Sequence, residues 1–150
     1  MGLDMYLHKK TYVKNWEHMS AEERHQITIK KNGKVRKDIQ PKRISSIEEE
    51  VAYWRKFNAL HKWFVENVQK GVDDCGDYYV DVDKLKELLA ELEKVVKDKS
   101  KAAEILPTAS GFFFGGTEYD EYYFQDVKDT IKVLKELVKE EGDFYYYSSW

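Results

Sequence analysis

Cysteine, long apolar runs and a strong excess of one charge are all missing or nearly missing from this sequence. The single cysteine, Cys75, excludes a disulfide within the chain. No apolar stretch approaches the roughly 20 residues that a membrane-spanning helix needs. The opening residues 1–5 also lack the basic and apolar regions of a signal peptide. We therefore expect a cytoplasmic protein without a membrane partner.

Charges of both signs are abundant and nearly balanced. The 25 Lys and Arg residues and the 28 Asp and Glu residues leave a formal net charge of -3. A polybasic nucleic-acid-binding chain or an acidic tail has a marked excess of one sign. The composition of the whole chain therefore predicts no nucleic-acid partner.

Motifs for metal, cofactor or covalent chemistry are also missing. The acidic stretch 73–83 lacks the spacing and the closing Glu of a calcium loop. Three histidines stand at unrelated spacings beside one cysteine, which disfavours structural zinc. A phosphate-binding loop requires a Lys directly after its glycines, and none follows the glycines of segment 111–116. Cys75 lies next to aspartates, which disfavour its thiolate. We expect no metal, no cofactor and no recognisable catalytic residue.

Aromatic residues are the feature in excess, at 15% of the chain, with 11 Tyr, 7 Phe and 4 Trp. Tyrosine and tryptophan combine an apolar body with a polar tip, which suits surfaces that recognise a ligand or partner. A chain of 150 residues has the usual size of one domain. The length therefore predicts one domain over 1–150, and the aromatic excess favours the binding of a ligand or partner. The order of the predicted elements, described next, places this domain in the α+β class.

The pattern predicts an antiparallel or mixed sheet packed by three amphipathic helices at about 47–69, 83–98 and 120–141. Asn32-Gly33 is typical of a type I′ turn and predicts a β-hairpin at about 26–39. We interpret its many Lys and Arg residues as a solvated edge, and a phosphate-binding role is the alternative. Other strands are expected at 3–13, 78–82 and 144–150, and a short one between the glycines of 111–116.

The first predicted helix carries polar groups on its apolar side. Asn58 and His61 fall within its apolar stripe beside Trp54, and Arg55 lies on the flank. Buried polar groups need hydrogen-bond partners. Either Asn58 and His61 are satisfied inside the core, or they line a pocket in which Arg55 could pair a phosphate. The sequence leaves both open.

The segment from residue 106 to 117 places glycines on both sides of three phenylalanines. Glycine permits positive φ and close backbone approach, so this loop could cradle a ligand with Thr108, Ser110 and Phe113. The alternative is a tight β-bulge that buries Phe113. Tyr119 and Tyr122 follow at the start of the last helix.

Several blocks resemble a family of small phage and prophage proteins. These are the opening MGLDMYL, RKFNALHKWF at 55–64, LPTASGFFFG at 106–115, YDE at 119–121 and the closing YSSW. The resemblance covers most of the chain and is weakest at 14–43. It implies the cytoplasm of an infected or lysogenic bacterial host and a context in which small proteins act as counter-defence factors, some by sequestering nucleotide immune signals in aromatic pockets.

Our leading hypothesis is a non-enzymatic protein that binds a small, nucleotide-like ligand by aromatic stacking and by phosphate pairing with Arg. The alternatives are a metal-independent nucleotide hydrolase or lyase that uses His61 as acid or base, and an inhibitor that contacts a host protein through its aromatic surface. The oligomeric state is open, and a homo-oligomer is compatible with the sequence. The predicted ligand-binding residues are Trp54, Arg55, Asn58, His61, Thr108, Ser110, Phe113, Tyr119 and Tyr122.

Overall fold

The computed structural model describes residues 2–111 and 114–150, and it confirms the α+β class. A four-stranded antiparallel sheet is accompanied by a separate β-hairpin. The strands are β1 (Asp4–Tyr12), β2 (Lys30–Lys31), β3 (Lys34–Val35), β4 (Ser46–Arg55), β5 (Asp77–Val80) and β6 (Asp143–Ser149). The α-helices are α1 (Asn58–Asn67), α2 (Val82–Lys97), α3 (Ala102–Ile105) and α4 (Glu121–Leu137), and short 3₁₀ turns lie at Ala21–Glu23, Pro41–Arg43 and Lys99–Lys101.

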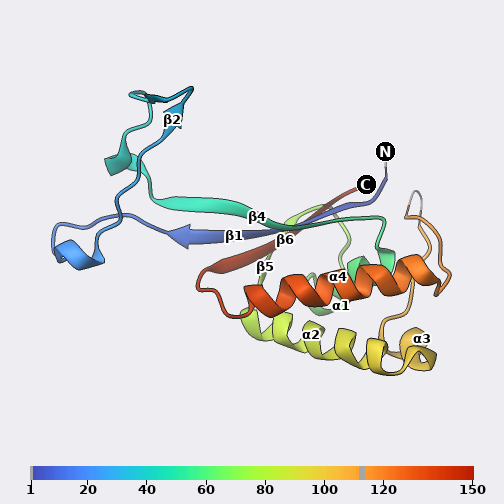
Figure 1. Ribbon diagram of the computed structural model, residues 1–150. Helices are drawn as coiled ribbons and strands as arrows, with labels where there is room; N and C mark the ends of the chain where they lie inside the picture. Colours follow the sequence, from blue (N-terminus) through green and yellow to red (C-terminus); the bar gives the residue numbers. More distant parts are fainter. Residues whose placement is uncertain (1, 112–113) are drawn as a thin grey trace.

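The main sheet has the strand order β4-β1-β6-β5, so the first strand is central. The inward side chains Met5 and Leu7 of this strand, and Leu3 just before it, are completely buried, as their alternation in the sequence predicts. Helices α1, α2 and α4 all lie on one side of this sheet (Figure 1). The opposite side has no helix over it in residues 2–111 and 114–150.

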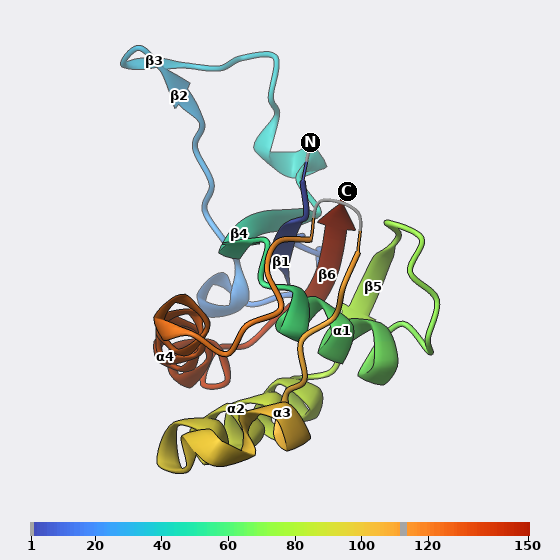
Figure 2. The same ribbon diagram turned by 90° about the vertical axis from the view of Figure 1, so that its right-hand side faces the viewer.

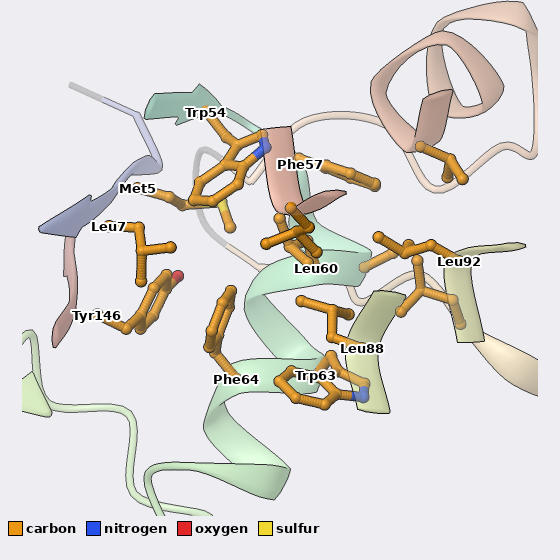
Figure 3. Packing of buried hydrophobic residues seen from close by; sticks show 14 of the residues in the cluster. Met5, Leu7, Trp54, Phe57, Leu60, Trp63, Phe64, Leu88, Leu92 and Tyr146 are labelled. Carbon is orange, nitrogen blue, oxygen red and sulfur yellow. The ribbon is translucent and has the colours of Figure 1, made fainter. Parts of the chain in front are cut away.

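The core lies between the sheet and the helices (Figure 3). Its centre is the ring of Phe64 on α1, which stacks on Tyr146 of β6 at a centroid distance of 3.9 Å. Leu88 and Leu92 of α2 close the core on the side away from the sheet and are fully buried. Helix α1 is therefore buried on more than one side, as its nearly continuous apolar surface predicts.

Helices α2 and α4 confirm two of the three predicted helices. Each begins after an aspartate cap: Asp81 accepts a hydrogen bond from the Asp83 amide, and Asp120 accepts one from the Tyr123 amide. Helix α2 matches its expected bounds within one residue. Helix α4 ends at Leu137 rather than at 141, and a turn with Gly142 at positive φ leads into β6.

The predicted helix at 47–69 is wrong in its first half. Residues Ser46–Arg55 form strand β4, Lys56 turns the chain at a φ of 57°, and the helix begins only at Asn58. Pairing with β1 explains the difference, since it places the run Glu48–Glu50 opposite Lys10, Lys9 and His8. These cross-strand charge pairs and the hydrogen bonds of β1 outweigh the local helix preference of a Glu- and Ala-containing segment.

Residues 14–45 leave the sheet between β1 and β4 and form a projection that we call the arm (Figures 1 and 2). The Val13 amide donates to the Ser45 carbonyl at 2.9 Å, so the arm leaves and returns at the same place. The turn is confirmed: Asn32 and Gly33 have φ angles of 52° and 76°, as a type I′ turn requires. Its strands, however, are only two residues long, and no arm residue is buried.

The short strand expected within 111–116 is not formed by the residues described there. Gly111 and residues 114–116 have no regular secondary structure. Residues 112 and 113, including the predicted ligand contact Phe113, lie outside the described residues.

Candidate functional site

The predicted ligand-binding residues fall in three separate places. Trp54 and Arg55 end strand β4, and Asn58 and His61 lie on α1. The other described residues, Thr108, Ser110, Tyr119 and Tyr122, lie between residue 106 and the first turn of α4. Asn58, Thr108 and Tyr122 line one pocket, and Trp54 and Arg55 line another. The structure therefore does not gather the predicted set into one site.

His61 is enclosed in the core, with 1% of its surface exposed. Its Nδ1 lies 2.7 Å from the Tyr146 hydroxyl and its Nε2 lies 2.9 Å from Asp73 Oδ2. The other Asp73 oxygen accepts a hydrogen bond from Trp150 Nε1 at 3.0 Å. Both ring nitrogens are thus occupied by the protein. Of the two interpretations of this histidine, the structure supports satisfaction inside the core.

Tyr146 completes this network on the sheet side. Its side chain is fully buried, and burial raises the pKa of its hydroxyl well above the usual value, with the negative charge of Asp73 adding to the effect. The hydroxyl therefore remains protonated. The network joins α1, the segment before β5, strand β6 and Trp150, and it ties these parts of the chain together from inside the protein.

Asn58 holds the 106–119 loop against α1. Its Nδ2 donates to the carbonyls of Phe114 and Gly116, at 3.1 and 2.8 Å, and its Oδ1 accepts from the Ala109 amide at 3.0 Å. Gly115 allows the close approach, since its φ is +88° and a Cβ there would lie 3.2 Å from Lys56 Cβ. The amide of Asn58 thus positions a loop, and three of its four hydrogen-bonding positions are used.

A pocket of about 210 Å³ lies between this loop and the start of α4, and we call it the α4 pocket. The residues that line it are Lys56, Phe57, Asn58, Thr108, Gly116, Glu118, Asp120, Tyr122, Tyr123 and Asp126. Thr108 donates its hydroxyl to the Thr117 carbonyl, and its amide donates to the Tyr119 hydroxyl. Tyr122 is 83% exposed at the rim. Ser110 is exposed and does not belong to this lining.

The α4 pocket is acidic. Its charged lining is one cation, Lys56, against Glu118, Asp120 and Asp126. Burial raises the pKa of the Asp126 carboxyl, and repulsion from Asp129 and Asp120 adds to the effect. A phosphate group in this pocket would meet more negative than positive charge.

Trp54 and Arg55 are also engaged by the protein. Trp54 is buried and donates through Nε1 to Thr130 Oγ1 at 2.9 Å. Arg55 donates to Asp4 Oδ1 at 2.8 Å, and the Tyr53 hydroxyl donates to the same oxygen at 2.6 Å. The hydrogen bond from Tyr53, followed by Arg55, lowers the pKa of Asp4. Capture of a phosphate by Arg55 would require this ion pair to open.

A surface that the sequence did not predict lies on the side of the sheet without helices. We call it the tyrosine face, and it consists of Tyr6, Tyr53, Tyr79, Tyr145 and Tyr147. Tyr6 is in its centre, 5.3 Å from the ring of Tyr53 and 5.7 Å from that of Tyr147. Tyr79 and Tyr145 form an edge-to-face pair at 5.7 Å. Tyr53, Tyr79 and Tyr147 are 48%, 54% and 37% exposed.

Strand alternation could have located this surface. In β6 the buried residues are Phe144, Tyr146 and Ser148, so Tyr145 and Tyr147 must point to the other side. The sequence signal was hidden because three consecutive tyrosines give no contrast between inner and outer positions. Tyr6 and Tyr53 could be placed beside them only after the strand order was known.

The edge of the tyrosine face along β5 is negatively charged. Asp77 and Asp143 are exposed there, and Asp81 follows β5. Partial desolvation, followed by the charges of Asp81 and Asp143, raises the pKa of the Tyr79 hydroxyl. The face thus combines an aromatic centre with an acidic border along β5, while Lys10 Nζ lies over the Tyr145 ring at 4.5 Å.

No family model, no curated protein and no solved structure matches this chain. Within residues 2–111 and 114–150, no helix has the length and apolarity needed to cross a membrane.

Proposed function

We propose that this chain is a recognition protein that binds another protein through the tyrosine face. The observation that carries the proposal is a sheet side without helices on which five tyrosines gather in two contacting groups. An antiparallel sheet that faces water usually presents polar side chains there. Large exposed aromatic patches are typical of interaction sites, because tyrosine supplies wide contact area and a polar tip.

Charge complementarity indicates the chemistry of the partner. Asp77, Asp81 and Asp143 border the face on its β5 side, so the partner should present Lys or Arg opposite them and apolar side chains opposite Tyr6. Such charges steer association and select the partner, while the central aromatic residues supply most of the affinity. In the phage context that the sequence resemblance implies, this partner would be a host protein that the phage inhibits.

The test compares capture from a bacterial lysate by the wild type, by Tyr6→Ser and by Tyr122→Ser. Tyr122 is the control, since it is an exposed tyrosine outside the face. A partner that wild type and Tyr122→Ser retain, and that Tyr6→Ser loses, supports the proposal. The purified partner should then bind Asp77→Asn with a lower association rate. Equal capture by all three proteins, or a homodimer formed through this face in light scattering, contradicts it.

The second candidate is the binding of a small nucleotide-like ligand in the α4 pocket, which in the phage setting would sequester an immune signal. Its support is the meeting of Asn58, Thr108 and Tyr122 with the rings of Phe57 and Tyr123. The pocket is somewhat below the roughly 300–1,000 Å³ of typical ligand pockets. Its carboxylates favour contact with a base or ribose and leave phosphates at the rim.

Thermal-shift measurements with cyclic dinucleotides and ADP-ribose derivatives test this candidate. Ligand binding should raise the melting temperature of the wild type by mass action, and Tyr122→Ala should lose most of that increase. Mass spectrometry of the nucleotide after incubation and denaturation distinguishes binding from hydrolysis. An intact nucleotide supports sequestration, while a product supports the hydrolase or lyase alternative.

A further inference from the structure

Charge in this protein is segregated between the arm and the rest of the chain. Residues 14–45 contain nine of the 25 Lys and Arg residues and four of the 28 Asp and Glu residues, which leaves the arm at +5 and the remainder at -8. The whole-chain value of -3 hides this separation. The expectation of no nucleic-acid partner was based on that averaged charge.

Most of the positive charge of the arm is uncompensated. Five lysines of the arm are exposed and form no ion pair among the described residues. They are Lys30, Lys31, Lys34, Lys37 and Lys42. Of the acidic residues, Asp38 pairs with Arg36, and Glu23 accepts a hydrogen bond from the Ser20 amide, so these two carboxylates are already occupied. A solvated sheet edge does not account for so many cations, because β2 and β3 are two residues long each.

A second observation also indicates an anion. A pocket of about 260 Å³ at the base of the arm is lined by Val13, Asn15, Arg24, His25, Ile27, Pro41 and Lys42. This lining contains Arg, Lys and His and no carboxylate. Asn15 fixes the shape of this pocket through two hydrogen bonds of 2.8 Å to the backbone of His25. Its Nδ2 donates to the His25 carbonyl, and its Oδ1 accepts from the His25 amide. We call it the arm pocket.

We infer that the arm binds the phosphate backbone of a nucleic acid, with the hairpin lysines along the backbone and a phosphate in the arm pocket. The core of a protein interface is usually apolar, whereas the exposed large apolar side chains among the described arm residues are three, Trp16, Ile29 and Val35, beside five unpaired lysines. Contacts with phosphate oxygens carry no sequence information, and lysine suits them as a point charge on a flexible stem. Binding is therefore independent of sequence, and the acidic remainder of the protein stays away from the phosphates.

The test measures fluorescence anisotropy of a labelled duplex of about 20 base pairs, and of the matching single strand, between about 50 and 200 mM salt. The arm variant replaces Lys30, Lys31, Lys34 and Lys37 by Ala. The control variant replaces four exposed lysines of α4 and the turn that follows it, Lys128, Lys132, Lys135 and Lys139, by Ala. Both variants change the net charge equally, and far-UV circular dichroism verifies that both are folded.

The wild type should bind both nucleic acids with an affinity that falls steeply with salt. The arm variant should bind at least about tenfold more weakly, with a duplex salt slope reduced by about 3 to 4, whereas the control variant should remain within about twofold of the wild type. Three results would overturn the inference: no binding by the wild type at the lowest salt, equal losses in the two variants, or displacement of the nucleic acid by polyglutamate at equal charge concentration. The last result would assign the arm to an acidic protein.

Discussion

Replacing His61 by alanine tests whether the hydrogen-bonded network of α1 is a structural device. The substitution removes an imidazole that is 1% exposed and leaves the Tyr146 hydroxyl, which is itself fully buried, without its partner at 2.7 Å. Asp73 is partly exposed and can turn to water. The cost therefore comes from the cavity and from Tyr146.

The size of the loss follows from these two contributions. Large-to-small substitutions in a packed core cost about 2–5 kcal/mol, since neighbours collapse only partly into the space. An unsatisfied buried hydroxyl costs a further 1–3 kcal/mol or so. We expect His61→Ala to lower the free energy of unfolding by at least about 3 kcal/mol, the sum of the two lower limits, which is a large part of the roughly 5–15 kcal/mol typical of a domain. This corresponds to a decrease of about 10 °C or more in Tm.

Urea unfolding followed by circular dichroism measures this loss. His18→Ala is the matched control, because His18 is exposed in the arm and should stay within about 0.5 kcal/mol of the wild type. Tyr146→Phe keeps the ring stacked on Phe64 and removes only the hydroxyl. The double variant should lose less than the sum of the single losses, as expected for a coupled pair. A loss below about 1 kcal/mol for His61→Ala, at an unchanged m-value, would refute the structural role.

Asn58→Ala should lower stability by roughly 1–3 kcal/mol and should accelerate hydrogen exchange of the Ala109 amide, whose acceptor it removes; unchanged protection would contradict its role in positioning the loop. Because the raised pKa of Asp126 makes its ionised form unfavourable in the folded protein, Asp126→Asn should stabilise at pH 7, and the gain should vanish in acid titrations once the carboxyl is protonated. A gain that persists at low pH would have another cause. Leu88→Asp places an unpaired charge in the core and should abolish cooperative thermal unfolding; a melt near the wild-type temperature would disprove its burial. Gly33→Val should disrupt the hairpin in NMR spectra, since valine resists a φ of 76°, yet change the urea midpoint little, because the arm adds nothing to the core.

Local signals in the sequence were sufficient for several elements. The apolar periods of α2 and α4 depend on residues three or four positions apart, so these helices can be predicted from a short window of sequence. The same holds for the turn at Asn32 and Gly33, where backbone sterics select the residues. The sequence alone also identified Asn58 and His61 as buried polar groups that need partners.

Tertiary contacts decided everything that depends on distant partners. Strand β4 replaces a helix because β1, roughly 40 residues away, offers a pairing edge with opposite charges. His61 is structural because Tyr146, 85 residues later, takes its Nδ1. The tyrosine face exists only because the order β4-β1-β6-β5 brings Tyr53, Tyr6 and Tyr147 side by side. Such contacts are stabilised by burial and strand pairing between segments that lie far apart in the sequence, and local conformational preferences do not determine which segments pair. The sequence could therefore indicate the residues involved but not which of them are in contact.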